Sequence, residues 1–337
     1  MSNIYITQGW QKRGGEIALK NLLTIDNALS ESIILNLGDR DFNIKNIKEI
    51  KINILKSLNI LSLLNLYLFL FKYNQKKYKF YYVNGNIVKF SFVLFFVNLL
   101  SDNKVKLVVW EHCLPHKHWD VNNILKKSII KYFYYLLINM SYEIIVPSAI
   151  IKNELLPSKK SIKIFNNPLI VNTFPDCQII PLIREENINI IYVGALSLEK
   201  NPFLFLEIIS KAVSVNSSVR GFLIGNGDLK EQLLTKIKEL QLERVVSIID
   251  WRENIHSIIN RCSIVIITSK FETYCNVIAE SLALGSVVFS TQWDGVKSIY
   301  EDKIFYLSMD LDYDVKNILS SINTRKFCMM EKQIIVI

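Results

Sequence analysis

The chain has 337 residues, half of them hydrophobic, and a formal net charge of +9. This length is typical of two domains of ordinary size, and the apolar fraction is enough for a large core. The five cysteines are scattered, and no Cys-x-x-Cys pair occurs, which argues against a disulfide framework or a structural zinc site and favours a reducing compartment.

The positive charge is concentrated in the first half of the chain. Residues 1–170 hold 23 Lys/Arg and 11 Asp/Glu, net +12, whereas the remainder holds 17 and 20, net −3. Nucleic acid, an anionic membrane surface or simply a solvated lysine-rich surface would each explain a basic half. The N-terminus has no basic region followed by an apolar core, so we expect no signal peptide.

In chain order, the first half predicts short strands alternating with helices. The strands are NIYIT, SIILNL, FYYV, KLVVW and EIIVPS. The best-marked helices are the amphipathic helix that a turn enters in KRGGEIALKNLLTI and the lysine-rich ILKKSIIKYFYYLLINM. Two uncharged segments, 57–71 and 90–101, are too short to span a bilayer. We interpret both as core helices, with helices that lay one face on a membrane as the alternative.

The second half repeats the alternation after a segment broken by prolines and paired asparagines. Its strands are INIIYVG, GFLIG, VVSIID, SIVIITS and SVVFS, with helices between them. Such alternation predicts an α/β protein with two doubly wound, Rossmann-like domains facing a cleft. We place the first domain at 1–165, a linker at 166–182 and the second domain at 183–337, and leave open whether the short C-terminal tail packs back on the first domain.

The stretch SKFETYCNVIAESLALG places Glu272 and Glu280 eight residues apart. Glu272 follows a strand that ends near Ser269, and a helix is expected to begin near Cys275. Ligands of open parallel sheets bind at the carboxyl ends of the strands, where a helix N-terminus attracts anions. One acid on either side of a phosphate group suits a nucleotide sugar, because carboxylates accept hydrogen bonds from sugar hydroxyls. The alternative is a charge at the start of the helix and an exposed helical residue.

Several segments resemble the donor-binding half of retaining GT-B glycosyltransferases of family four. The likeness is continuous from about residue 188 to 301 and is carried by YVGALSLEKNPFLFLE, LIGNGDLKEQL, SKFETYCNVIAESLALGSVVFST and WDG. The E-x7-E motif of that family matches Glu272 and Glu280. A weaker likeness precedes it in RGGEIALKNL, WEH and FNNPLIV. The resemblance implies the GT-B fold, with an acceptor-binding first domain and a donor-binding second domain.

The resemblance also implies roles for residues of the second domain. Glu272 would hydrogen-bond the hydroxyls of the transferred sugar, and Glu280 those of the ribose. Lys200 would neutralise the diphosphate. Backbone groups would cap that diphosphate, namely those of Tyr274, Cys275 and Asn276.

Further positions are implied around the donor. Gly14 and Gly15 would let the backbone of the first domain approach the donor phosphate and the acceptor, and His112 would orient the reacting sugar. Gly194 would lie against the donor, and Gly225, in the GNG turn, would border the nucleotide pocket.

The chain departs from the family pattern at two places in this site. Ala195 stands where an arginine often follows the glycine of YVG, and Thr273–Cys275 replaces the usual glycine–aromatic–glycine loop. Both changes bear on diphosphate affinity more than on fold. Lys270 is a candidate for the missing cation.

No metal site is expected. The spacing of His112, His116 and His118 matches no standard zinc site. The Asp39–Asp41 segment has the spacing of a metal–diphosphate motif of another transferase fold, and Asp310–Asp314 lacks the glycine and glutamate of a calcium loop. We interpret both acidic segments as surface turns.

The function expected from these features is retaining, metal-independent transfer of a sugar, of the hexosyltransferase type. The donor would be a nucleotide-diphosphate sugar and the acceptor a glycan or lipid-linked diphosphate, in lipopolysaccharide, capsule or other surface polysaccharide biosynthesis. The basic first half would contact the anionic inner face of the cell membrane from the cytoplasm, without nucleic acid. A GT-B sugar-nucleotide epimerase and a non-catalytic GT-B-like binding protein remain as alternatives.

Overall fold

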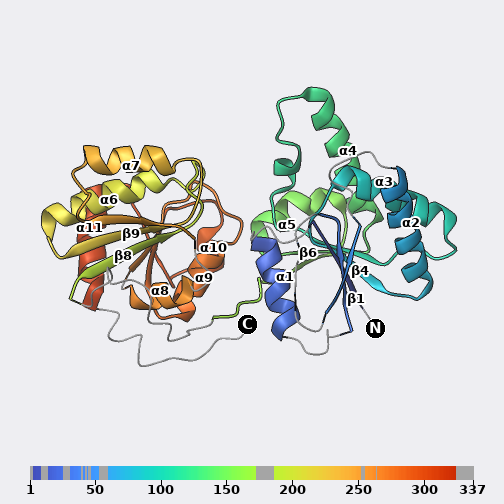
Figure 1. Ribbon diagram of the computed structural model, residues 1–337, viewed down its shortest axis with the longest axis horizontal. Coiled ribbons are helices and arrows are strands. Elements are labelled where there is room, and N and C mark those ends of the chain that lie inside the picture. Colours follow the sequence, from blue (N-terminus) through green and yellow to red (C-terminus); the bar gives the residue numbers. More distant parts are fainter. Residues whose placement is uncertain are drawn as a thin grey trace. The chain divides into compact units, whose positions relative to one another are not determined.

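The computed structural model describes residues 3–8, 14–25, 31–38, 41, 44, 47–52, 60–171, 186–251, 255–262 and 264–323. The chain divides into two compact units, Met1–Pro168 and Leu169–Ile337, each built on one β-sheet (Figure 1). Most of the expected linker, and the C-terminal tail after residue 323, lie outside the described residues.

The first unit contains a seven-stranded sheet in the order β3-β2-β1-β4-β5-β6-β7. Every strand pairing described in it is parallel. The strands are β1 Asn3–Thr7, β2 Ile33–Asn36, β3 Lys48–Lys51, β4 Lys79–Tyr82, β5 Leu107–Trp110, β6 Glu143–Val146 and β7 Ile162–Ile164. The chain leaves β1 toward β2 and later returns to β4 on the other side, so the loops after β1 and β4 flank the switch point of this sheet.

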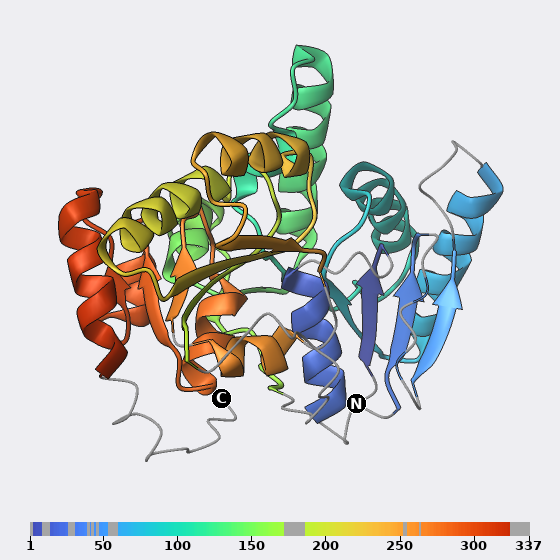
Figure 2. The same ribbon diagram turned by 60° about the vertical axis from the view of Figure 1, so that its left-hand side comes forward.

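Helices cover this sheet, and two of them begin at asparagine caps. Asn86 accepts a hydrogen bond from the backbone of Lys89, and Asn123 from that of Lys126, which satisfies an N–H group that the helix itself leaves unpaired. The helices are α1 Gly14–Ile25, α2 Ile60–Gln75, α3 Ile87–Leu100, α4 Ile124–Met140 and α5 Ala149–Leu155, with 3-10 turns η2 Pro115–Trp119 and η3 Leu156–Ser158. Helix α3 contacts both α2 and α4, so these three form a row (Figures 1 and 2).

The two uncharged segments form α2 and α3, apart from residues 57–59, which lie outside the described residues. Each helix buries one face only. On α2, Leu66 and Leu70 are fully buried, whereas Leu64 and Leu68 are exposed. The interpretation of both segments as core helices is therefore wrong for their outer faces. In the part of the chain that the structure describes, no helix combines the length and hydrophobicity needed to cross a bilayer.

The second unit contains a six-stranded sheet in the order β10-β9-β8-β11-β12-β13, again with parallel pairings throughout the described strands. The strands are β8 Ile188–Val193, β9 Val219–Ile224, β10 Val246–Ile249, β11 Ile264–Ile267, β12 Val287–Ser290 and β13 Phe305–Tyr306. Strands buried on both faces read as near-continuous apolar runs, as β11 and β12 do. The switch point of this sheet lies between β8 and β11.

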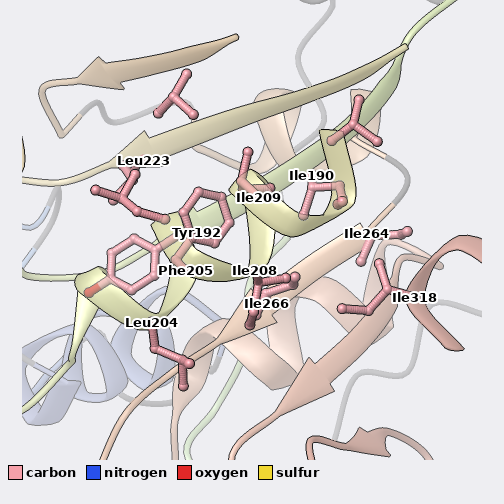
Figure 3. Packing of buried hydrophobic residues seen from close by; sticks show 14 of the residues in the cluster. Ile190, Tyr192, Leu204, Phe205, Ile208, Ile209, Leu223, Ile264, Ile266 and Ile318 are labelled. Atoms are coloured by element: carbon pink, nitrogen blue, oxygen red, sulfur yellow. The ribbon is translucent and has the colours of Figure 1, made fainter. Parts of the chain in front are cut away.

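The helices of the second unit pack on both faces of that sheet. They are α6 Pro202–Val215, α7 Lys230–Glu239, α8 Ile255–Arg261, α9 Asn276–Ala283, α10 Val296–Tyr300 and α11 Leu311–Ser320, followed by the 3-10 turn η4 Ser321–Asn323. Figure 3 shows the core on one face, where Phe205 and Ile209 of α6 meet Tyr192 of β8 and Ile266 of β11. All four side chains are almost completely buried. This core fixes the ends of β8 and β11, from which the candidate site is built.

Candidate active site

Two loops meet at the switch point of the second sheet. The loop after β11 runs from Thr268 to Cys275, and the loop after β8 carries Lys200. The Thr268 hydroxyl donates to the carbonyl of Lys200 at 2.9 Å, and the Lys270 N–H donates to the carbonyl of Glu199 at 2.8 Å. One side chain–backbone and one backbone–backbone hydrogen bond therefore join the two loops at the same edge of the sheet.

Glu272 is held at this edge by two donors. The Lys200 ammonium lies 2.6 Å from its Oε1 atom, and the Ser269 hydroxyl donates to the same oxygen at 2.9 Å. Burial disfavours the charge on Lys200, but the Glu272 carboxylate outweighs it and raises the lysine pKa. The site thus contains a mostly buried ion pair whose acid and base come from the two loops beside the switch point.

Cys275 ends the loop in the left-handed conformation, with φ of 60°, and α9 begins at the next residue. The Tyr300 hydroxyl lies 2.7 Å from the carbonyl oxygen of Tyr274 and 3.0 Å from that of Cys275, and so braces the turn from α10. Burial raises the pKa of the Cys275 thiol, so the group is protonated at neutral pH and is a poor nucleophile. The predicted start of the helix near Cys275 is correct, and its positive end lies directly after the Glu272 loop.

Glu280 is the fifth residue of α9 and is only 9% exposed. Its Oε2 atom lies 3.8 Å from Nε2 of His256 on α8, a contact that sequence reasoning did not find. The alternative of an exposed helical residue is therefore wrong for Glu280.

Gly194 and Gly225 lie side by side where β8 and β9 end. A Cβ atom on Gly225 would lie 1.8 Å from the carbonyl oxygen of Gly194, and one on Gly227 would lie 2.3 Å from that of Leu196. Leu196 donates its N–H to the carbonyl of Asn226, so the two loops also hydrogen-bond. The GNG sequence is thus explained by close approach of two backbones at the edge that carries Lys200.

In the first unit, the structure brings Gly15 and His112 together. A Cβ atom on Gly15 would lie 2.7 Å from Cδ2 of His112, so the glycine leaves the space that the imidazole fills beside the start of α1, at Gly14. Burial lowers the pKa of His112 to about 4, despite the opposing charge of Glu111. His112 is therefore a neutral imidazole at physiological pH.

Glu111 fixes the loop that carries His112, and sequence reasoning missed it. Its carboxylate accepts hydrogen bonds from the backbone of Cys113 at 3.0 Å, from Tyr134 on α4 at 3.1 Å, and contacts Nε2 of His118 at 2.9 Å. Burial disfavours the charged forms of both Glu111 and His118. The attraction between the two charges nevertheless raises the pKa of His118, and the same attraction together with the hydrogen bonds lowers the pKa of Glu111. A buried ion pair between about pH 4.5 and 6.5 follows from these shifts.

Comparison with known proteins places these features in a family. The family described as Glycosyl transferases group 1 matches residues 178–307. That range contains Lys200, Glu272, Glu280, and the glycines at the ends of β8 and β9. The match to this family therefore covers much of the second unit and none of the first.

The chain is also similar to a curated protein of Campylobacter jejuni. This N-acetylgalactosamine-N,N'-diacetylbacillosaminyl-diphospho-undecaprenol 4-alpha-N-acetylgalactosaminyltransferase is 26% identical over 217 residues. The match covers 62% of this chain and 58% of the relative's length.

Solved structures extend the likeness to both units. HepE from Anabaena in complex with UDP-glucose matches with a TM-score of 0.75 at 17% identity, over 98% of this chain and 93% of that chain. The apo form of the lipopolysaccharide outer core galactosyltransferase WaaB matches with a TM-score of 0.66 at 15% identity, over 97% and 91% of the two chains. The predicted GT-B fold, with its two parallel sheets, is confirmed.

The first unit also has a polar network at the switch point of its sheet, which sequence reasoning missed. Asn84, after β4, accepts from the Thr7 hydroxyl at 2.9 Å and from the Gln8 N–H at 2.7 Å, and donates to Glu16 of α1 at 2.8 Å. The sequence does contain a signal for this network, because a polar residue follows each of the two strands that flank the switch point. Gln8 follows NIYIT and Asn84 follows FYYV.

The histidines considered for zinc are held apart by separate partners. His116 contacts Glu154 at 3.1 Å on the surface, His118 contacts Glu111, and His112 packs beside Gly15. Among the described residues, no three His, Cys, Asp or Glu side chains gather in a way that could hold a metal ion.

The two acidic segments differ in what the structure describes. Asp39 and Arg40 lie outside the described residues, and Asp41 forms an ion pair with Lys51. Asp310 caps the N-terminus of α11 as a turn residue can. Asp314 is not a surface turn, because it is 3% exposed and accepts hydrogen bonds from the backbone before the helix, at Ser308 and Met309.

Proposed function

We propose that this chain is a retaining glycosyltransferase that moves a sugar from a nucleotide-diphosphate sugar to a lipid-linked diphosphate or glycan acceptor. One observation carries the proposal: the buried Lys200–Glu272 pair at the switch point of the second sheet, directly before the N-terminus of α9. A carboxylate for sugar hydroxyls and two positive groups for a diphosphate then lie at one sheet edge. The HepE complex with UDP-glucose supports the donor class.

In the proposed complex, each group of the second unit has one task. Glu272 accepts hydrogen bonds from the hydroxyls of the transferred sugar, and Glu280 from those of the ribose. Lys200 has three N–H donors, so it can stay paired with Glu272 and still donate to a phosphate oxygen. The backbone of the turn from Tyr274 to Asn276 caps the diphosphate, with Gly194 and Gly225 allowing close approach.

In the proposed reaction, the diphosphate leaves the anomeric carbon, and the site stabilises the negative charge that develops on the leaving diphosphate. Fixed positive groups aimed at that charge lower the barrier, and we propose that they do so without a divalent metal. The leaving phosphate accepts the proton of the acceptor hydroxyl, and configuration is retained. A protonated Cys275 and a Glu272 already engaged by two donors support a mechanism without a protein nucleophile.

The first unit is proposed to hold the acceptor. His112 stays neutral and orients the reacting sugar beside Gly14 and Gly15. The name of the Campylobacter jejuni relative contains a diphospho-undecaprenol acceptor, which supports a lipid-linked diphosphate here and a role in surface polysaccharide biosynthesis. We propose that the chain acts at the cytoplasmic face of the cell membrane, with the basic first unit toward the lipid.

The test combines binding and turnover. Titration with UDP and GDP by calorimetry should show binding of one nucleotide, and a donor sugar should be transferred to a soluble short-chain diphosphate acceptor. Glu272→Gln should lower turnover at least about tenfold, or ~1.4 kcal/mol, whereas Glu231→Gln on the exposed face of α7 should not. Release of free sugar without an acceptor would instead identify an epimerase, and absence of nucleotide binding would rule out the proposal.

A further inference from the structure

The outer faces of α2 and α3 are apolar and exposed. On α2 the exposed large apolar side chains fall on one stripe, at Ile60, Leu61, Leu64 and Leu68. Helix α3 has a second stripe at helical spacing, formed by Phe92, Phe95, Phe96, Leu99 and Leu100. Single exposed apolar residues are ordinary on a protein surface, but two neighbouring stripes on helices in contact mark an interaction surface.

Helix α4 continues this surface and projects from the unit. Its first two turns extend past the other helices of the first unit in both views (Figures 1 and 2). Ile124 and Leu125 are 79% and 76% exposed, and Ile129, one turn further, is also exposed. Exposure of these apolar side chains to water is unfavourable, so we expect a partner to cover the tip of α4.

The charge of the three helices has one sign. Together α2, α3 and α4 contain five lysines and no aspartate or glutamate. The three lysines of α4, at positions 126, 127 and 131, lie among its exposed apolar residues. The flanking segments contain exposed acids, Asp102 after α3 and Asp120 before α4, but the helices themselves contain none, unlike α7 and α11 of the second unit.

The combination of apolar stripes and lysines indicates what this surface binds. Lysines without carboxylates complement an anionic lipid leaflet, and apolar stripes complement its acyl region. None of the described helices is suited to span a bilayer, so they would lie in the interface plane. A second copy of this chain is the weaker candidate, because two identical all-positive surfaces repel each other.

We propose that the exposed faces of α2, α3 and α4, called here the α2–α4 surface, insert into the headgroup region of an anionic bilayer. Leu125 at the tip of α4 anchors in the acyl boundary, and Lys126, Lys127 and Lys131 contact lipid phosphates. Membrane insertion of this surface would explain how the chain reaches a lipid-linked acceptor, and in this respect the inference rests on the proposed function. Vesicle binding itself can be measured without that function.

The test is co-sedimentation of the full chain with vesicles of phosphatidylcholine alone or with one third phosphatidylglycerol. Binding is expected only to the anionic vesicles. The double variant Leu125→Glu/Lys127→Glu should weaken binding to them at least about tenfold. New acids in the first turn of a helix favour the helix dipole, so the variant is expected to fold. The matched control is Leu234→Glu/Lys238→Glu on α7, which should bind vesicles as the parent does.

Transfer to a soluble short-chain acceptor separates this inference from the proposed function. The α4 variant should keep that turnover unchanged while losing vesicle binding. Equal binding of parent and α4 variant to anionic vesicles would overturn the inference, as would binding to neutral vesicles alone. The inference would also be overturned if the parent protein did not sediment with anionic vesicles. A parent that is dimeric, with an α4 variant that is monomeric, would likewise overturn it. Vesicle binding without any transferase activity would contradict the proposed function only.

Discussion

Replacing Glu111 by glutamine tests the buried ion pair that fixes the His112 loop. Glutamine keeps the shape but has one acceptor oxygen in place of two, so it can accept from only one of Cys113 and Tyr134, and it removes the negative charge that His118 contacts at 2.9 Å. Breaking a buried pair costs about 3–5 kcal/mol when one charge is left alone, and a hydrogen bond to a charged group about 1.5–3. Because glutamine keeps part of the network and His118 is partly exposed, we expect a loss of about 2–3 kcal/mol near pH 5.5.

The size of this loss should depend on pH. The pKa of His118 is raised above 6.5, so its contribution is full below pH 6.5 and is lost as the pH rises through the folded value. The pKa of Glu111 is lowered below 4.5, so its contribution is full above pH 4.5 and is lost as the pH falls through the folded value. The pair therefore stabilises most between about pH 4.5 and 6.5, and the variant should lose that maximum.

Hydrogen exchange of peptides from β5 to α4, measured in urea at pH 5.5 and at pH 9 and corrected for the intrinsic rate, reports this unit separately. The difference between parent and Glu111→Gln should shrink at pH 9. The control is His116→Ala, which removes a surface contact with Glu154 at 3.1 Å and should cost less than about 1 kcal/mol. If Glu111→Gln costs the same at both pH values, the charge of Glu111 does not support the fold and the argument fails.

The other predictions concern the second unit. Gly225→Ala should destabilise it by about 3 kcal/mol or more in urea unfolding, because the new methyl would lie 1.8 Å from the Gly194 carbonyl oxygen, whereas Gly285→Ala, at φ of 72° with open space, should cost only about 1–2. A double-mutant cycle of Lys200→Met and Glu272→Gln should give a coupling of about 1–3 kcal/mol in unfolding, and additive losses would contradict the buried pair. Excess EDTA should leave sugar transfer unchanged, and its loss would show metal dependence.

The sheet architecture could be predicted from the sequence because its central strands are buried on both faces and read as unbroken apolar runs. Short peripheral strands could not. Strand β3, with lysines at both ends, has an exposed or half-buried pattern, and β13 has two residues only. Their position depends on pairing with a neighbour, and neither composition nor period shows that.

In the site, the residues after strands were predictable and their partners were not. Glu272 follows a clear strand and precedes a clear helix, so its position follows from local sequence. The contact of Glu280 with His256 joins positions 24 residues apart, and that of Gly15 with His112 joins positions 97 apart. Such contacts follow from strand order and side-chain packing, which local patterns do not contain.

The two switch points bear on the proposal that the second unit binds the donor. Each has a glutamate whose partner comes from a loop across the switch point. In the first unit Glu16 accepts a hydrogen bond from the amide of Asn84, and in the second unit Glu272 pairs with the ammonium of Lys200. A lysine at a helix N-terminus attracts a diphosphate. The described contacts of the second switch point therefore suit it to hold an anion.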